Sequence, residues 1–101
     1  MKRKFSINLL EEAIEFIENL DEKSKVKVLY NLNLATLKND KNLFKKLNDQ
    51  IWEFRTLYNK EALRLFAFWD KTDKEETLVI CTHGIVKKTQ KIPDYNGLPV
   101  F

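Results

Sequence analysis

The stretch from residue 50 to residue 92 constrains the fold most, because it holds three apolar, aromatic-rich runs in close succession. The runs cover residues 50–57, 62–69 and 76–86, and short polar breaks separate them. Runs of this length bounded by Asn, Asp and Lys are typical of strands, and breaks this short can only join neighbouring strands. We therefore predict an antiparallel three-stranded meander followed by a basic segment, residues 87–91.

The first half of the chain has the spacing of two helices that cover this sheet. Apolar side chains recur at helical intervals over residues 8–20 and again over residues 21–39. Asn8, with Glu11 three residues on, resembles a capping box for the first helix, and Asp21 is a suitable N-cap for the second. The link between the helices is very short, so we expect them to form a hairpin.

Two short segments flank the helices. Residues 2–5 suit an edge strand, and residues 40–49 read as a lysine-rich connector that three large apolar side chains pin to the core. The expected fold class is therefore α+β, with two N-terminal helices packed on a mostly antiparallel sheet of about four strands. Five aromatic residues of the strands are expected in the core rather than as platforms for stacking bases: Trp52, Phe54, Phe66, Phe68 and Trp69.

Length and composition indicate an ordinary globular chain. The 101 residues suit a single domain spanning 1–101, and the 44% hydrophobic and 33% charged residues are typical of a soluble protein. No apolar run is long enough to cross a membrane, and the basic start is followed by glutamates rather than by the apolar segment of a signal peptide. We expect a cytoplasmic protein in which the single cysteine, Cys81, is a buried thiol.

The charges are distributed unevenly along the chain. The net charge is +3, residues 7–20 carry four Glu and no base, and residues 87–91 carry three Lys and no acid. A basic patch at the rim of a sheet suits a phosphate-bearing partner, although a solvated lysine loop would have the same composition. With one His, one Cys and no CxxC or HExxH motif, the sequence predicts neither a metal site nor a cofactor.

Three motifs carry a family resemblance. They are Trp-Glu-Phe-Arg at 52–55, Leu-Arg-Leu-Phe-Ala-Phe at 63–68 and Thr-His-Gly-Ile-Val-Lys-Lys-Thr-Gln-Lys-Ile-Pro at 82–93. Together they resemble the HigB-like, phage-derived branch of the RelE/ParE toxin superfamily, in which similarly spaced motifs read LWELR, RIFYF and HGFxKKTxKTP. This sequence has Ile85 where that branch has Phe, and from Asp94 onward it departs from the charged helix that usually follows.

The resemblance implies the toxin of a type II toxin–antitoxin system. Such a toxin is expected to cleave mRNA on the ribosome without a metal ion and to bind a small helix-turn-helix antitoxin. Two alternatives stay open. One is a ParE-like toxin that inhibits DNA gyrase, and the other is a catalytically dead phage remnant that only binds its antitoxin.

Cleavage of RNA without a metal makes three chemical demands. The 2′-OH must lose a proton, the phosphorane must be stabilised, and the 5′ oxygen must gain a proton. Arginine suits the second task because its guanidinium grips two phosphate oxygens at once. Arg64 lies within an apolar run, where it needs either a buried partner such as Glu53 or a functional face, and the resemblance makes it the phosphate clamp.

The remaining site candidates follow from the same chemistry. Arg55 resembles the family's basic residue on the first long strand and is assigned to RNA binding, the alternative being a solvent pair with a glutamate. His83 is a catalytic candidate because histidine is the residue type best suited to proton transfer near neutral pH, although a lone histidine on an apolar strand is often structural. Tyr95 is a catalytic candidate because some relatives use a terminal tyrosine as acid or base.

Three lysines complete the predicted site. We assign Lys88 to catalysis and Lys87 and Lys91 to RNA binding. A lysine held among other cations loses its proton more readily and can then serve as a base. The pattern itself does not distinguish among the three.

Overall fold

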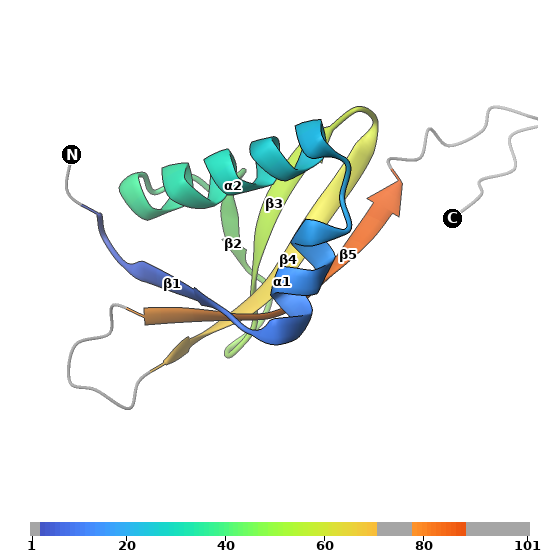
Figure 1. Cartoon of the computed structure of the whole chain (residues 1–101). Helices are drawn as coiled ribbons and strands as arrows, with labels where there is room; N and C mark the ends of the chain where they lie inside the picture. The colour runs from blue at the N-terminus through green and yellow to red at the C-terminus, as the bar shows by residue number, and fades with distance from the viewer. Residues whose placement is uncertain (1–2, 71–77, 89–101) are drawn as a thin grey trace, which may run out of the picture.

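The structure is a computed structural model, and it describes residues 3–70 and 78–88 (Figure 1). Its elements in chain order are β1 (Ser6–Leu9), α1 (Glu11–Glu18), α2 (Glu22–Leu37), β2 (Phe44–Lys46), β3 (Trp52–Tyr58), β4 (Glu61–Asp70) and β5 (Leu78–Lys88). The predicted Lys91 and Tyr95 sites lie outside the described residues. No helix in the described ranges is long and apolar enough to cross a membrane.

The five strands form one mixed sheet in the order β1-β5-β4-β3-β2. The β1 strand runs parallel to β5, with Ser6 opposite Leu78 and Leu9 opposite Cys81, and β2 pairs antiparallel with β3. The prediction of a mostly antiparallel sheet of about four strands is therefore wrong. Its failure has a physical cause, because the β1–β5 pairing joins segments about seventy residues apart and leaves no periodic signal in either.

Both outer strands arise where the sequence suggested something else. Residues 6–9 form β1, so the expected capping box at Asn8 does not exist, and α1 begins at Glu11 after an N-cap position, Leu10, that makes no side-chain cap. Residues 44–46 form β2 inside the expected connector. Three residues are too few to show an alternating pattern in the sequence.

The central meander is confirmed. The β3 and β4 strands pair antiparallel, as do β4 and β5. The β3–β4 turn consists of Asn59 and Lys60, whose φ angles are 52° and 63°. Two residues with positive φ match the right-handed twist of a hairpin and give the break its short length.

The helices cover one face of this sheet (Figure 1). The predicted N-cap of α2 is confirmed, since the Asp21 carboxylate accepts a hydrogen bond of 2.8 Å from the Ser24 backbone N–H. The two helices contact each other little, because α1 packs mainly on β5 and α2 mainly on β3. The expected short link is present, but the sheet rather than the other helix receives each apolar face.

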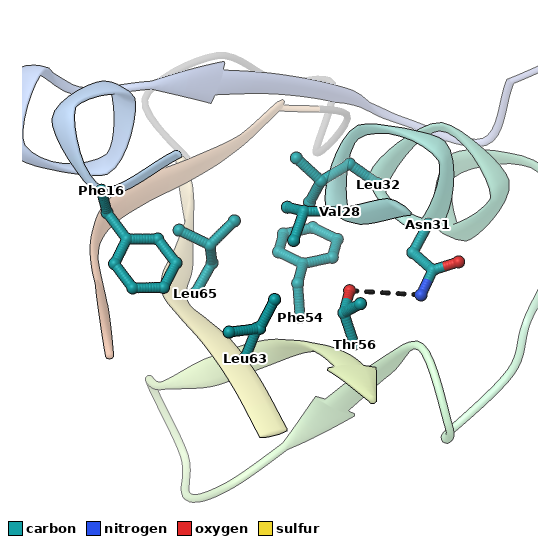
Figure 2. Close-up of a pocket in the computed structure, with 8 residues that line it drawn as sticks. All are labelled: Phe16, Val28, Asn31, Leu32, Phe54, Thr56, Leu63 and Leu65. Atoms are coloured by element: carbon teal, nitrogen blue, oxygen red, sulfur yellow. Dashed lines mark hydrogen bonds between the residues drawn. The ribbon is translucent and has the colours of Figure 1, made fainter. Parts of the chain in front are cut away.

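The core lies between the helices and the sheet. Its buried residues come from both layers and include Ala13, Ile17, Val28, Leu32, Ala35, Phe54, Leu63, Leu65, Ala67, Val79 and Cys81. Figure 2 shows a pocket in this layer where Asn31 donates a 3.2 Å hydrogen bond to Thr56. The pocket has no room for a water molecule, so it is a packing seam and not a ligand site.

Candidate phosphate-binding site

The sheet face opposite the helices carries four of the seven predicted site residues. Side chains alternate along each strand, so residues directly opposite one another in an antiparallel pair share a face. Arg55 of β3 lies opposite Arg64 of β4, and Arg64 lies opposite Ile85 of β5. In the described part of the chain no helix covers this surface, which we call the open face.

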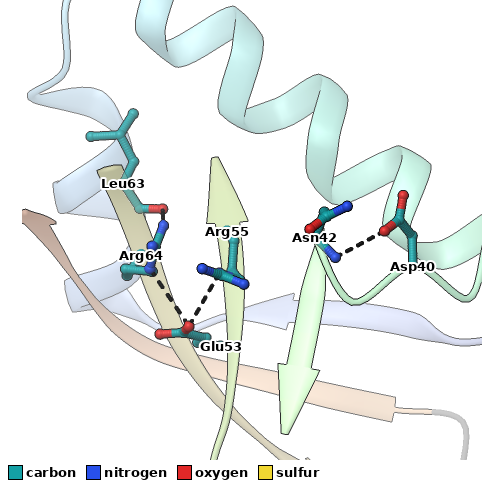
Figure 3. A network of polar contacts seen from close by, with 6 residues as sticks. All are labelled: Asp40, Asn42, Glu53, Arg55, Leu63 and Arg64. Carbon is teal, nitrogen blue, oxygen red and sulfur yellow. Dashed lines mark hydrogen bonds and ion pairs between the residues drawn. The ribbon is translucent and has the colours of Figure 1, made fainter. Parts of the chain in front are cut away.

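Glu53 links the two arginines (Figure 3). One carboxylate oxygen, Oε2, lies 3.4 Å from Arg55 Nε and 3.6 Å from Arg64 Nε. The Glu53 side chain is 11% exposed, and the Arg64 and Arg55 side chains are 16% and 30% exposed. The Glu53 partner considered for Arg64 from the sequence is thus present, and it serves Arg55 as well.

The charges at this site do not balance. Two guanidinium groups stand directly opposite each other, an arrangement that is unfavourable across strands, and one carboxylate compensates only one of them. Burial lowers the pKa of Arg64 from its ordinary value, Glu53 opposes that change, and the charge of Arg55 adds to it. The group still stays protonated, so the site keeps a net positive charge.

The arginines retain hydrogen-bond donors. Arg55 Nε is buried beside Glu53 and makes no hydrogen bond, so the donors that Arg55 can offer a ligand are those of its terminal Nη groups. Among residues 3–70 and 78–88, Arg64 donates one long hydrogen bond, 3.5 Å from Nη1 to the Leu63 carbonyl oxygen. Each guanidinium has five N–H groups, so this pair can receive an anion with several oxygens, such as a phosphate.

His83 lies one row along the same face. It stands opposite Phe66, with the two rings 5.1 Å apart, and Phe66 is two residues from Arg64 on β4. Its Nδ1 lies 2.9 Å from the Thr82 hydroxyl oxygen, and that hydroxyl also donates to the Phe66 carbonyl at 3.3 Å. Because Nδ1 is engaged, Nε2 is the ring nitrogen that the exposed imidazole offers to a ligand. The row of Phe66 and His83 lies about 6.6 Å along the strands from the row of Arg55 and Arg64.

The predicted lysines lie toward the other end of β5. Lys87 is exposed and stands opposite Ala62 on the open face. Lys88 stands opposite Glu61, one residue out of step with the open-face alternation. The structure therefore brings Arg55, Arg64, His83 and Lys87 onto the open face. The next backbone position, Lys88, alternates with these residues along β5 and does not share their face.

A hollow of about 440 Å³ lies beside the His83 row. Its lining includes Leu47, Asn48, Ile51, Phe66, Phe68 and Thr82. Phe68 is 39% exposed and Phe66 is half-buried on the open face, so the expectation that both belong to the core is wrong. The cause is strand alternation, since Leu65, Ala67 and Trp69 take the positions that face the helices.

The sequence reading missed Asn48 and Thr82. Asn48 lies in the segment that we predicted to be a connector, where the Asn-Asp pair at 48–49 is typical of a turn. Thr82 sits at a register shift, where Phe66 pairs with His83 and Ala67 with Cys81. Such bulges leave no pattern in a single sequence. In the described ranges, no three His, Cys, Asp or Glu side chains gather to hold a metal ion.

Comparison with known proteins bears on the family. No curated protein matches the chain. A family model described as phage derived protein Gp49-like (DUF891) matches residues 15–96, which is most of the chain and includes the end of α1, all of α2 and the open-face strands. The match extends over all the motifs quoted above, and the Gp49-like proteins form part of the RelE/ParE-like toxin group. This chain therefore belongs to the Gp49-like family of phage-derived, RelE/ParE-like toxins.

Proposed function

We propose that this protein is the toxin of a type II toxin–antitoxin system and that it cleaves mRNA, with the ribosome presenting the strand. The observation that carries the proposal is the pair of arginines, Arg55 and Arg64, that share a single carboxylate on the open face. A phosphodiester placed on this pair gains two guanidinium groups whose terminal donors make few hydrogen bonds within the part of the chain that the structure describes. The membership of a toxin-like family supports the same assignment.

The chemistry needs no nucleophile from the protein, because the 2′-OH of the RNA attacks the neighbouring phosphorus. Arg64 stabilises the phosphorane, and Arg55 holds the non-bridging oxygens from the other side. A donor that binds the phosphorane better than the ground-state phosphate lowers the barrier selectively. The excess positive charge between the two strands favours the state with the larger negative charge.

His83 is suited to a proton transfer in the same step. The Thr82 hydroxyl engages Nδ1, so that Nε2 accepts the 2′-OH proton or returns one to the 5′ oxygen. The new termini are then a 2′,3′-cyclic phosphate and a free 5′-OH. Lys87 binds the strand beyond the cut, and Lys88, Lys91 and Tyr95 remain proposed participants in catalysis or RNA binding.

The test is growth arrest and transcript cleavage after induction of the toxin alone. We expect Arg64→Ala to lose roughly 100- to 1000-fold in cleavage rate, the effect of removing one preorganised donor. Arg64→Lys should recover only part of this loss, because a point charge cannot reproduce the guanidinium fork. Arg3→Ala is the matched control, since Arg3 lies outside the open face and bonds Asn33 at 3.1 Å.

Each result separates the proposal from its alternatives. Full toxicity in a folded Arg64→Ala protein would remove Arg64 from the site. Growth arrest without transcript cleavage, together with induction of the DNA-damage response, would favour a gyrase inhibitor. A wild-type protein that binds a helix-turn-helix antitoxin but never arrests growth would be the inactive remnant.

The proposed partner is an antitoxin that covers the open face. Its inhibitory segment should be acidic, because Arg55, Arg64 and Lys87 lie together there. Crosslinking in the toxin–antitoxin complex checks this expectation. Crosslinks confined to the glutamates of α1 would mean that inhibition is indirect.

A further inference from the structure

The hollow beside His83 has the size and lining of a site for a nucleobase. Its volume of about 440 Å³ is ample for a nucleobase, and its walls are mainly apolar, from Leu47, Ile51, Phe66 and Phe68. Leu47, Ile51 and Phe68 are 45%, 42% and 39% exposed, an unusual concentration of apolar surface beside a charged pair. Aromatic side chains in such a place provide stacking surfaces for unpaired bases.

The hollow lies one row along the sheet from the arginine pair. Phe66 follows Arg64 by two residues on β4, and Glu53, Phe66 and His83 stand in one row across the sheet. Two residues of a strand span about 6.6 Å, a distance that one nucleotide covers between its phosphate and its base. A strand with one phosphate on Arg55 and Arg64 can therefore place a neighbouring base in the hollow.

Two hydrogen bonds fix the orientation of the Asn48 side-chain amide in the lining of the hollow. Its Oδ1 accepts hydrogen bonds from the backbone N–H groups of Gln50 and Ile51, each at 2.9 Å. These two bonds fix which end of the amide is oxygen, so Nδ2 is the group left for a ligand. No acceptor in the described part of the chain takes the Nδ2 protons.

We propose that this hollow is a base-binding subsite that selects keto bases, guanine or uracil, over the amino bases adenine and cytosine. Asn48 Nδ2 donates to the exocyclic oxygen, O6 of guanine or O4 of uracil. Adenine and cytosine present an amino group at the same position, and two donors then face each other. The inference rests on the proposed RNA substrate and adds the base class that the open face reads.

Asn48→Asp is the decisive variant. The aspartate keeps an oxygen for the two backbone N–H groups and so preserves the turn, but it replaces the Nδ2 donor by an acceptor. The probes are the four ribonucleoside 3′-monophosphates, titrated into the full chain and followed by NMR at the backbone amides of the hollow and at the arginine Nε groups. Asn39→Asp, an exposed position outside the hollow, controls for the added charge.

We expect the guanosine and uridine phosphates to bind the wild-type protein roughly three- to tenfold more tightly than the others, the effect of one hydrogen bond. Asn48→Asp should reverse this order, and Asn39→Asp should leave it unchanged. The subsite is overturned if the arginine signals shift while the amides at Asn48 and Ile51 do not, or if Asn48→Asp keeps the wild-type order. Shifts in the hollow without shifts at the arginines would instead support the subsite and contradict the proposed phosphate clamp.

Discussion

The ring of Phe16 in α1 lies directly against Gly84 of β5. A Cβ atom built on residue 84 would come within 2.3 Å of the Phe16 Cδ2 atom and 2.5 Å of Cγ. The glycine of the His-Gly motif is therefore explained by close helix–sheet packing. Because neighbouring residues of β5 face opposite sides of the sheet, His83 lies on the open face and Gly84 contacts the Phe16 ring on the other face.

Gly84→Ala should destabilise the protein by about 1–3 kcal/mol, the usual effect of overpacking a fitted contact. The expected change is a fall in the free energy of unfolding measured by urea denaturation. Phe16→Leu should relieve the clash, so the double variant should lose less stability than the sum of the two single variants. Strict additivity would contradict the contact.

Glu53→Gln should leave the two arginines facing each other without a carboxylate. Because the three side chains are partly exposed, we expect a loss of about 1–2 kcal/mol, below the 3–5 kcal/mol typical of a fully buried pair. Added phosphate should restore part of this stability by taking the place of the carboxylate. Urea denaturation with and without phosphate measures both effects, and Glu18→Gln on α1 is the control that phosphate should not rescue.

Cys81 should be chemically inert in the folded protein. It is fully buried, and burial raises the pKa of its thiol from 9.0 to about 12. A thiol reagent at neutral pH should therefore react only as fast as the protein unfolds. Rapid labelling under native conditions would show that this part of β5 opens readily.

The same pKa shift predicts a pH dependence of stability. Above pH 9 the unfolded thiol loses its proton while the folded thiol keeps it, so the unfolded state binds fewer protons and stability falls toward pH 12. Below pH 9 both states are protonated and the effect is absent. Comparison with Cys81→Ala isolates this contribution, because the variant should lack that part of the decline.

Lys60→Gly should stabilise the β3–β4 turn by about 0.5–1 kcal/mol, since a lysine at φ 63° is strained and glycine is not. Part of the gain is offset by the greater freedom of glycine in the unfolded chain. Thermal denaturation measures the change. Lys38→Gly, at φ −129°, should not stabilise the protein, and an equal gain there would contradict the explanation.

Several features follow from local sequence alone. Alternation and short polar breaks were enough to predict the β3–β4–β5 meander, and the Asp21 cap and the span of α2 followed from helical spacing. The arginine in the middle of an apolar run also indicated a special role for Arg64 and named Glu53 as a partner. These signals are local because they depend on residues a few positions apart.

Other features depend on contacts between distant segments. Residues 6–9, which include the expected start of the first helix, form a strand because they pair in parallel with β5. Residues 44–46 form β2 only by pairing with β3. The register of β3 on β4 set Arg55 opposite Arg64, and the shift beside Thr82 set His83 opposite Phe66. Periodicity shows which residues share a face of one strand, but the tertiary pairing of strands decides which side chains meet across the sheet.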